Sequence, residues 1–360
     1  MLSREQKLVS AGAAVHVALR RALLRWYDRE RRELPWRGTA DPYAIWVSEV
    51  MLQQTTVNAV IPYYERFLAA FPDASALARA SEDRVLALWA GLGYYRRARA
   101  LREAARELVR RHGGALPRTA DGLRRLPGFG PYTAGAVASI AFGEVEPAID
   151  GNAARVLSRI AALAAPRPRE LRELALRLID RRRPGDFNQA LMELGARVCT
   201  PRAPRCEECP LAARCTARAG GQAEALPRPA ARREPVRLAR GAVRIVDRRG
   251  RVLFARAPEG APNAGLWELP WAELADAPAA PDAIVTAVGA RHGLPLRGGS
   301  LLGTVRHAIT YRRIVVHVVA ARLAGGAPRG DGWRWLAPAD ATSAGITAAT
   351  RKALALSLDE

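Results

Sequence analysis

Leu126-Pro-Gly-Phe-Gly-Pro-Tyr-Thr-Ala134 is the stretch from which the organisation of this chain can be worked out. Its two glycines, Gly128 and Gly130, allow the positive φ angles of a tight turn, which leads directly into a helix expected to run through Ala141. Such a turn leaves backbone N–H groups uncovered at the helix N-terminus, where they can hold a phosphate without reading its base. The stretch therefore predicts a hairpin that binds the backbone of a nucleic acid.

Two carboxylates are candidates for chemistry near this hairpin. Asp150 stands just ahead of a helix expected over 153–162, where an acid can serve as a cap or as a reagent. Glu49 lies in a helix expected over 45–55 and shares a face with Ile45 and Leu52. A carboxyl group held against apolar side chains loses hydration, which raises its pKa and suits it to donate a proton. The alternative is that Glu49 is an ordinary helix glutamate, in water or paired with an arginine.

Length and charge narrow the class of protein. The 360 residues predict two domains, and 56 Lys plus Arg against 35 Asp plus Glu give a net charge of +21. This excess favours a polyanionic partner, most simply nucleic acid. A GC-rich genome explains the preference for Arg over Lys, since only Lys7 and Lys352 are lysines, but it does not explain the scarcity of acids. No long apolar run or signal peptide is visible, so we expect a protein of the bacterial cytosol.

The periodicity of apolar residues changes along the chain. Residues 1–12 are expected to be a leader, and 13–222 show helical spacing without a strand pattern. Residues 223–238, rich in Pro, Ala and Arg, are expected to be a linker. Residues 239–360 are expected to form a smaller α+β domain. In that domain the pattern predicts strands over 242–246, 252–255 and 313–323, a turn over 265–270 and a final helix over 347–356.

Two further segments carry side chains suited to contacts with nucleic acid. Gln53, Gln54 and Thr55 end the Glu49 helix, where amides can contact base edges or fill a gap left by an extruded base. Tyr94 and Tyr95 follow a glycine turn and precede a cluster of arginines, so an aromatic side chain there can wedge between stacked bases. We expect Tyr95 to pack in the core.

All four cysteines lie in one short segment with the spacing C-x6-C-x2-C-x5-C: Cys199, Cys206, Cys209 and Cys215. Four thiols so close together in a reducing compartment indicate a metal site. A four-cysteine zinc site usually has two CxxC knuckles, whereas this segment has one knuckle flanked by single cysteines. The spacing therefore favours one 4Fe-4S cluster over zinc. Such a cluster can act as a structural staple or in redox chemistry.

These stretches together resemble the adenine DNA glycosylases, the MutY family of the helix-hairpin-helix glycosylase superfamily. The matching stretches run in family order over roughly residues 20 to 225: Leu34-Pro-Trp-Arg37, Val47 to Thr55, Gly91-Leu-Gly-Tyr-Tyr95, Leu126 to Ala134, Asp150-Gly-Asn152, Phe187 to Ala196 and the four cysteines. The resemblance implies a monomeric base-excision repair enzyme that flips adenine out of double-stranded DNA, where it is mispaired with 8-oxoguanine or guanine, and removes it.

The resemblance also implies roles for individual residues. Glu49 matches the general acid that protonates adenine, and Asp150 matches the carboxylate that stabilises the sugar cation or adds to it transiently. Other matches support the pocket (Tyr132 and Asn152), contribute an active-site arginine (Arg37), or insert near the oxidised guanine (Gln54 and Tyr94). Endonuclease III-like lyases carry a Schiff-base lysine where this chain has Tyr132, so a monofunctional glycosylase is expected.

The C-terminal domain resembles the family's Nudix-like module, which recognises the 8-oxoguanine strand. Residues 281–293 lack the glutamate-rich helix of a working Nudix hydrolase, so nucleotide hydrolysis is not expected. The family's Phe-Ser-His loop is replaced by Ile309-Thr310-Tyr311, with His307 two residues earlier. Thr310 keeps a hydroxyl, which predicts altered but retained discrimination between 8-oxoguanine and guanine. The alternative is that this strand belongs to the core and that the first domain discriminates.

Two other functions are compatible with the same residues. One is a glycosylase of the same fold that acts on thymine or another mismatched base. The other, from a different class, is a non-catalytic iron–sulfur protein that binds DNA or senses redox state. A pair of intact carboxylates, Glu49 and Asp150, weighs against a pure binder.

Overall fold

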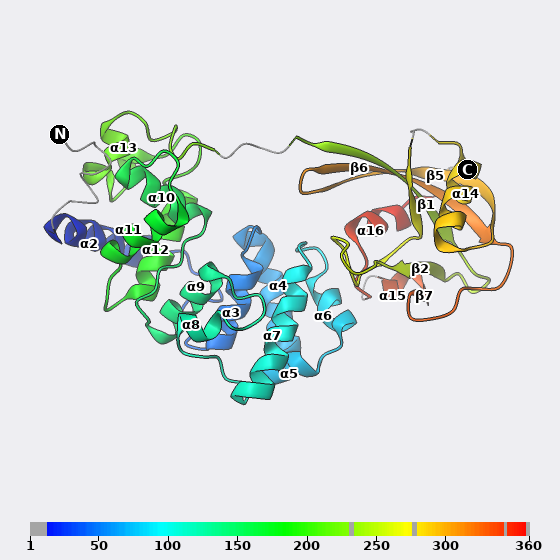
Figure 1. Cartoon of the computed structure of the whole chain (residues 1–360), viewed down its shortest axis with the longest axis horizontal. Helices are drawn as coiled ribbons and strands as arrows, with labels where there is room; N and C mark the ends of the chain where they lie inside the picture. Colours follow the sequence, from blue (N-terminus) through cyan, green and yellow to red (C-terminus); the bar gives the residue numbers. More distant parts are fainter. Residues whose placement is uncertain (1–12, 230–233, 276–278, 342–343, 358–360) are drawn as a thin grey trace. The chain divides into compact units, whose positions relative to one another are not determined.

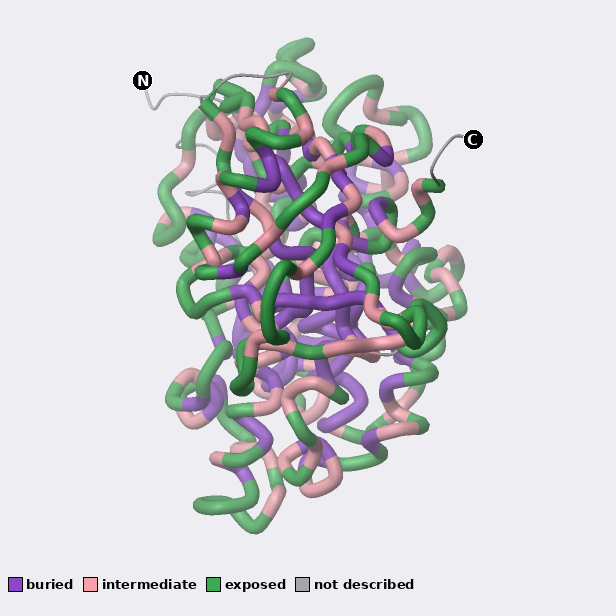
Figure 2. Tube along the Cα trace, turned by 90° about the vertical axis from the view of Figure 1, so that its right-hand side faces the viewer, coloured by how far each residue is buried: buried purple, intermediate pink, exposed green. Residues whose placement is uncertain are grey.

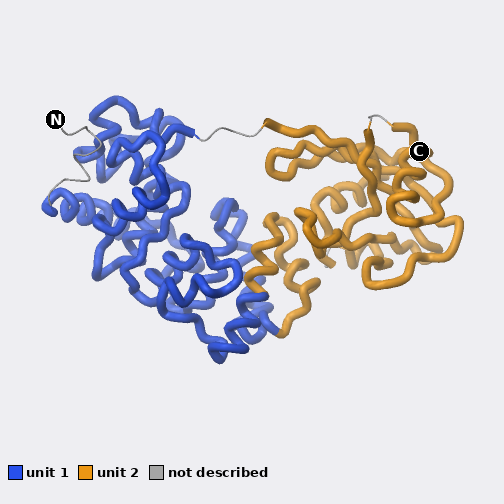
Figure 3. The backbone as a smooth tube through the Cα atoms, viewed as in Figure 1, with its two compact units in different colours: residues 1–78, 103–231 blue, residues 79–102, 232–360 orange. Residues whose placement is uncertain are grey.

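The computed structural model describes residues 13–229, 234–275, 279–341 and 344–357, so the expected leader lies outside the described residues. The chain divides into two compact units (Figure 3). The first consists of residues 1–78 and 103–231, and the second of residues 79–102 and 232–360. Within the described ranges, none of the helices combines the length and apolar character needed to cross a membrane.

In the described part of the chain that precedes strand β1 (Val236–Ile245), all the regular elements are helices (Figure 1). Its helices are α2 (Ala13–Glu30), α3 (Pro42–Met51), α4 (Val57–Ala70), α5 (Ala74–Arg79), α6 (Glu82–Trp89), α7 (Arg96–His112), α8 (Ala120–Leu123), α9 (Pro131–Phe142), α10 (Gly151–Ala161), α11 (Pro168–Leu178), α12 (Pro184–Arg197) and α13 (Thr216–Ala219), with 3-10 turns η1 (Cys206–Glu208) and η2 (Ala212–Arg214). The predicted all-α character of this region is confirmed.

Helix α3 carries Glu49 and has well-defined ends. Asp41 caps it, because its carboxylate accepts hydrogen bonds from the backbone N–H groups of Tyr43 and Ala44, and Pro42 occupies the first turn. The helix ends at Met51, earlier than the predicted residue 55. Gln54 then takes a φ of 56°, a left-handed conformation that a continuing helix cannot contain.

The core of the first unit lies between α2, α10, α11 and α12, which contribute buried residues such as Leu23, Leu157, Leu174 and Leu194. In Figure 2 the buried stretches, drawn purple, lie in the interior, and exposed stretches follow the outer turns. Helix α10 has apolar residues on one face only, as expected for a helix that packs on one side. Because α10 and α12 pack together, the N-terminus of α10, which carries Asp150, is held by a rigid support.

The second unit contains two sheets, with strand orders β4-β1-β6-β5 and β3-β2-β7. The strands are β1 (Val236–Ile245), β2 (Val252–Arg256), β3 (Trp267–Glu268), β4 (Trp271–Leu274), β5 (Leu296–Ile309), β6 (Arg312–Leu323) and β7 (Trp333–Leu336). In addition to α6 and the start of α7, the unit contains the helices α14 (Pro281–His292), α15 (Pro338–Ala341) and α16 (Ala348–Leu354). Only the β1–β6 pair is parallel among these strands. The predicted α+β class of this region is confirmed.

Two cores cover the two faces of the larger sheet. Val318 belongs to the core that includes Ala353 of α16, whereas its neighbour Val319 belongs to the core that includes Ile284 of α14. Successive residues of a strand point to opposite faces, so α16 and α14 cover opposite faces of the sheet. This two-sided burial explains the nearly continuous apolar run in β6.

The sequence pattern missed part of this sheet. Residues 265–270, expected to be a turn, include the short strand β3, which pairs with β2. Strand β5 was not predicted at all, because Gly298, Gly299 and Gly303 interrupt its apolar alternation. Its pairing with β6 shifts register between Arg297 and Ser300 and again between Leu301 and Gly303. Such irregularities accommodate residues that a sequence pattern reads as a loop.

Candidate active site

One cavity of about 580 Å³ in the first unit brings together most of the predicted site residues. It is lined by the predicted residues Arg37, Glu49, Gln53, Gln54, Thr55, Gly128, Gly130, Tyr132, Asp150 and Asn152. These residues come from four segments: the end of α3, the hairpin before α9, the start of α10 and the turn after α2. The cavity is large enough for a nucleobase.

Glu49 lies at the inner wall of this cavity and is 5% exposed. The Tyr132 hydroxyl donates a hydrogen bond of 2.6 Å to its Oε2 and lies 3.3 Å from the sulfur of Met192. The pKa of Glu49 is raised to about 7: burial is the largest cause and the nearby Asp150 adds to it, while the hydrogen bond from Tyr132 and the charge of Arg37 oppose the rise. A carboxyl group with such a pKa is protonated in a substantial fraction of molecules at neutral pH.

Asp150 caps helix α10 and is fixed through both of its carboxylate oxygens. Its Oδ1 accepts a hydrogen bond of 2.7 Å from the Ala153 N–H, and its Oδ2 accepts one of 2.9 Å from the Asn152 amide. Arg155 donates to the carbonyl oxygen of the Asn152 side chain at 2.8 Å. This second bond determines which end of the amide faces Asp150, so the carboxylate is held in one orientation at a helix N-terminus.

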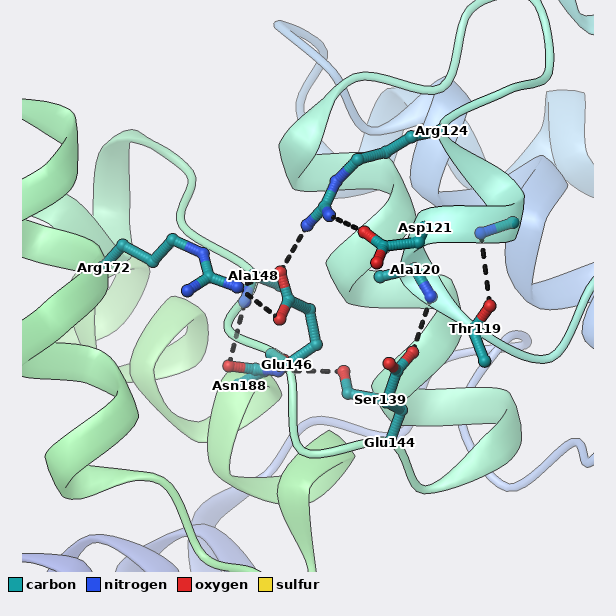
Figure 4. Close-up of polar contacts among 11 residues, drawn as sticks. Thr119, Ala120, Asp121, Arg124, Ser139, Glu144, Glu146, Ala148, Arg172 and Asn188 are labelled. Atoms are coloured by element: carbon teal, nitrogen blue, oxygen red, sulfur yellow. Dashed lines mark hydrogen bonds and ion pairs between the residues drawn. The ribbon is translucent and has the colours of Figure 1, made fainter.

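A buried amide secures the segment that leads into Asp150 (Figure 4). Asn188 of α12 is 1% exposed and accepts a hydrogen bond from the Ala148 N–H at 3.1 Å. Its Nδ2 donates to the Ser139 hydroxyl at 2.8 Å and to the Glu146 carbonyl at 2.9 Å. All of the side chain's polar atoms are therefore used to join α9, α12 and the segment before Asp150.

The Glu146 carboxylate connects the end of α8, the helix before the hairpin, to α11 (Figure 4). It accepts hydrogen bonds from Arg124, which follows α8, and from Arg172 of α11, the latter at 2.6 and 2.9 Å. Glu146 is 8% exposed, and a carboxylate so buried requires the two guanidinium partners it has. The hairpin is thus fixed from its N-terminal side.

The hairpin itself is joined to the helix that carries Glu49. Gly128 has a φ of 77°, as the predicted turn requires, and Gly130 caps α9 with Pro131 in the first turn. Phe129, between the two glycines, stacks on Trp46 of α3 with ring centroids 5.2 Å apart and an interplanar angle of 24°. The position of the hairpin's backbone N–H groups is therefore coupled to the position of Glu49 through one aromatic contact.

The ion pair of Glu193 with Arg32 and Arg37 at the cavity was not predicted from the sequence. Glu193 of α12, whose side chain is fully buried, accepts two hydrogen bonds of 2.7 and 2.8 Å from Arg32 and one of 2.7 Å from Arg37. Burial alone would raise the pKa of Glu193, but the hydrogen bonds from Arg32 and Arg37 outweigh it and lower the pKa. The paired residues are far apart in the chain, so no local spacing indicates them.

The three polar residues that follow α3, Gln53, Gln54 and Thr55, differ in their contacts and exposure. Gln53 donates to the Thr133 hydroxyl at 2.9 Å and so joins α3 to α9. Gln54, at its left-handed φ, is exposed at the cavity rim, and the Thr55 hydroxyl donates to the Gln53 carbonyl at 3.3 Å. Gln54 is therefore the residue of this group whose side chain is most available to a ligand.

Helix α12 can approach the N-terminal end of α10 closely because residue 195 is glycine. A Cβ atom at Gly195 would lie 2.6 Å from the Cβ and 2.8 Å from the carbonyl oxygen of Asn152. Neither contact is possible without a backbone shift. The glycine therefore determines how near Asn152 and Asp150 lie to Glu193 and Met192 on the facing helix.

The remaining predicted contact residues lie in the second unit. Tyr94 is 47% exposed, with a φ of 49°, and Tyr95 is buried as predicted. In the β5–β6 hairpin Ile309 pairs with Arg312, which leaves Thr310 and Tyr311 as the turn. Thr310 is exposed, so the tip of this hairpin is not part of the core. His307, on β5, is half-buried.

The four cysteines of 199–215 line one small cavity together with Arg159. Arg159 is 2% exposed, and its guanidinium donates to the Cys199 sulfur at 3.3 Å and to the carbonyl oxygens of Thr200 and Leu226. Among the described residues, no three Cys, His, Asp or Glu side chains lie close enough together to hold a single metal ion. A short loop that brings four thiols to one small cavity is the kind of ligand set that holds an iron–sulfur cluster.

Three family models match the chain, two of them on the helical unit with its cysteine loop and one on the second unit. Residues 47–181 match the helix-hairpin-helix superfamily of base-excision DNA repair proteins, and residues 199–215 match the iron-sulfur binding domain of endonuclease III. Residues 241–356 match the NUDIX domain. The class is therefore that of a DNA glycosylase with an iron–sulfur cluster, followed by a Nudix-like domain.

The particular family follows from two relatives, the first of which matches nearly the whole chain. The human adenine DNA glycosylase is 38% identical over 93% of this chain and 73% of the human protein. The adenine DNA glycosylase of Mycolicibacterium smegmatis is 45% identical over 55% of this chain and 69% of that protein. The chain belongs to the adenine DNA glycosylase family.

Solved structures agree on the helical unit. A thermostable thymine-DNA glycosylase is 30% identical, with a TM-score of 0.54 over 57% of this chain and 98% of that protein. A trapped complex of endonuclease III with DNA, at 22% identity and a TM-score of 0.50, covers 60% of this chain and shares the fold. The shared scaffold therefore does not by itself indicate which base the chain acts on.

Proposed function

We propose that the chain is a monofunctional glycosylase that removes adenine mispaired with 8-oxoguanine or guanine in double-stranded DNA. One observation carries the proposal: a buried Glu49 with a pKa near 7 and a fixed Asp150 line the same base-sized cavity. A glycosidic bond between adenine and deoxyribose can be broken when one group protonates the base and another stabilises the sugar cation. The adenine must leave the helix stack to reach such a cavity.

Glu49 is the proton donor in this scheme. Its carboxyl group transfers a proton to a ring nitrogen of the flipped adenine, and the electrons of the breaking C1′–N9 bond then move onto the base. Tyr132, which donates to Oε2, directs the proton of the acid toward the other oxygen. Arg37, held by Glu193, supplies a fixed positive charge that faces the base and stabilises the carboxylate left after proton transfer.

Asp150 acts on the sugar. Once adenine leaves, C1′ of the deoxyribose carries positive charge, and the Asp150 carboxylate stabilises that cation electrostatically or adds to it transiently. Water then attacks C1′, loses a proton, and leaves an abasic site. The hydrogen bonds from Ala153 and Asn152 hold the carboxylate in place, so little reorganisation is needed when the cation forms.

The absence of a suitable amine supports a glycosylase without lyase activity. Between Lys7 and Lys352 the sequence contains no lysine that could form a Schiff base with the abasic sugar. Tyr132 occupies the hairpin-helix position at which the lyases carry that lysine. The abasic product is therefore expected to stay intact until it is treated with alkali.

The test of this proposal is a panel of end-labelled duplexes that contain A:8-oxoguanine, A:G, T:G or matched A:T. We expect adenine release to be fastest opposite 8-oxoguanine, slower opposite guanine and absent from A:T, with strand cleavage only after alkali. Faster release of thymine from T:G would favour the specificity of the structural neighbour instead. No base release from any duplex would favour the non-catalytic binder.

The rate of adenine release should fall about tenfold per pH unit above pH 7 and level off below it. Glu49 acts in its protonated form, and because its pKa is raised to about 7, raising the pH through 7 removes the proton it must donate. Single-turnover rates measured between pH 5.5 and 9 check this. A rate that increases through pH 7 would mean that the limiting group is a base, not this acid.

The second unit is proposed to read the base opposite adenine, with the turn at Thr310 as its contact. Replacing Thr310 by Ala should reduce the preference for A:8-oxoguanine over A:G about threefold to tenfold, which is the effect of losing one hydrogen bond to an oxidised purine. The measurement is the ratio of single-turnover rates on the two duplexes. Thr286→Ala, at an exposed position of α14, is the matched control. An unchanged ratio in Thr310→Ala would assign discrimination to the first unit.

The iron–sulfur site is proposed to hold one 4Fe-4S cluster. Purified protein should contain about four iron atoms per chain and show the broad visible absorbance of such a cluster. Replacing Cys206 by Ala should lower both, because it removes one of the four ligands. Zinc in stoichiometric amount without iron would contradict the proposal.

A further inference from the structure

The turn between α6 and α7 holds an exposed aromatic side chain in an unfavourable backbone conformation. Tyr94 has a φ of 49°, although it is not a glycine, and the residue is 47% exposed. Left-handed backbone is uncommon for an aromatic residue, and it persists only where the surroundings determine it. Contacts within the turn must therefore hold Tyr94 in this conformation.

Arg97, one turn along, makes the contacts that do so. Its Nη2 donates to the carbonyl oxygens of Leu92 and Gly93, at 3.3 and 3.2 Å. Its guanidinium carbon lies 5.4 Å from the ring centroid of Trp89 and 5.6 Å from that of Tyr94. One planar cation therefore contacts the backbone before Tyr94, the floor of the turn and the tyrosine ring itself.

Trp89 provides the fixed base for this arrangement. It is fully buried at the end of α6, and its indole N–H donates to the Gly93 carbonyl at 3.1 Å. The Gly93 carbonyl thus accepts from both Trp89 and Arg97, and the Arg97 N–H donates to the Tyr94 carbonyl at 2.8 Å. Rotation of the turn would break these bonds together.

Arg97 also differs from its neighbours in how it is placed. Arg96 is exposed, as expected for a residue that faces a polyanion. Burial lowers the pKa of Arg97 to about 10, which still leaves its side chain charged at neutral pH. Its charge is thus directed at carbonyl dipoles and aromatic faces of its own turn.

We propose that Arg97 is a positioning residue that fixes the turn between Trp89 and Tyr94, so that the Tyr94 ring is presented to the DNA in one orientation. This inference rests on the proposed insertion of Tyr94 near the oxidised guanine. The two neighbouring arginines then have different roles: Arg97 fixes the conformation of Tyr94, and the exposed Arg96 can contact phosphate. Preorganisation of this kind lowers the entropic cost of inserting the ring.

The test uses the full chain and two readouts. One is the fluorescence change of 2-aminopurine placed next to 8-oxoguanine, which reports stacking by an inserted ring. The other is the single-turnover rate of adenine release. Arg97→Met, which keeps the apolar stem, should reduce the fluorescence change and slow release about tenfold. Arg96→Met, the same exchange at the exposed neighbour, should leave the fluorescence change intact and affect mainly the salt dependence of binding.

A double-mutant comparison with Tyr94→Ala makes the inference specific. If Arg97 acts through the ring, Tyr94→Ala/Arg97→Met should be no slower than Tyr94→Ala alone. Effects that multiply in the double variant would mean that Arg97 acts independently, and the inference would be wrong. If Tyr94→Ala itself leaves both readouts unchanged, the proposed insertion fails and the inference falls with it, whereas a loss in Tyr94→Ala without one in Arg97→Met overturns the Arg97 inference alone.

Arg97→Lys keeps the charge but lacks the planar fork, and it serves if Arg97→Met does not fold. Iron–sulfur absorbance and the melting temperature check the fold of each variant. A folded Arg97→Lys should keep DNA affinity near that of the unmodified chain but lose most of the 2-aminopurine response. A full response in this variant would show that charge alone is sufficient and would contradict the assignment.

Discussion

Replacing Glu49 by Gln should reduce the rate of adenine release by about 10²- to 10⁴-fold and leave binding to A:8-oxoguanine duplexes unchanged. The amide has nearly the same shape as the carboxyl group, and it can still accept the hydrogen bond from Tyr132. It cannot deliver a proton to adenine. Because Glu49 is buried and uncharged in much of the population near its pKa of about 7, the neutral replacement should also be tolerated by the fold.

The measurement is single-turnover base release beside equilibrium binding on the same duplex. Glu65→Gln makes the identical exchange at an exposed position of α4 and should release adenine at the normal rate. A Glu49→Gln protein that turns over normally would remove Glu49 from the mechanism. A protein that loses binding as well would show that Glu49 supports the cavity more than the chemistry.

Replacing Asp150 by Asn should slow adenine release by about 10²- to 10³-fold, as expected when one electrostatic contact to a developing charge is removed. The fold should persist because Asn is as good a helix cap as Asp, and its oxygen can accept from the Ala153 N–H. The lost quantity is the negative charge beside C1′. Circular dichroism and the melting temperature should therefore change little while the rate falls.

The pH profile distinguishes this variant from Glu49→Gln. The Asp150 charge helps to raise the pKa of Glu49, so Asp150→Asn should keep the alkaline fall in rate but shift it to lower pH. Asp73→Asn is the matched control, since Asp73 caps α5 through a 2.7 Å hydrogen bond to Ala76 and does not line the cavity. A profile that does not move would mean that the two carboxylates are not electrostatically coupled.

Local signals in the sequence predicted much of the fold and of the cavity lining. The glycine hairpin and the cysteine spacing each depend on residues only a few positions apart, and the structure has both. Glu49 was found because its helical spacing places it on an apolar face, and it is buried. Arg37, Tyr132 and Asn152 were predicted only from the resemblance to the adenine DNA glycosylases, because the spacing of apolar residues does not indicate them.

The strands of the second unit were predicted less completely. Strand β6 has a strong apolar pattern because both of its faces are covered, and it was found nearly in full. Strand β5 contains glycines and shifts register, so its pairing depends on the strand beside it and not on its own sequence. Propensity alone cannot identify such a strand.

The sequence by itself determined the helical class of the first unit, the hairpin, the four-cysteine segment and the positions of Glu49 and Asp150. The tertiary structure alone decided what holds them: Tyr132 on Glu49, Glu193 on Arg37, and Asn188 on the segment before Asp150. Each of these contacts joins residues that are distant in the chain, and its geometry depends on how closely helices pack. Helix packing follows from the volumes and shapes of many side chains at once, which a local pattern does not contain.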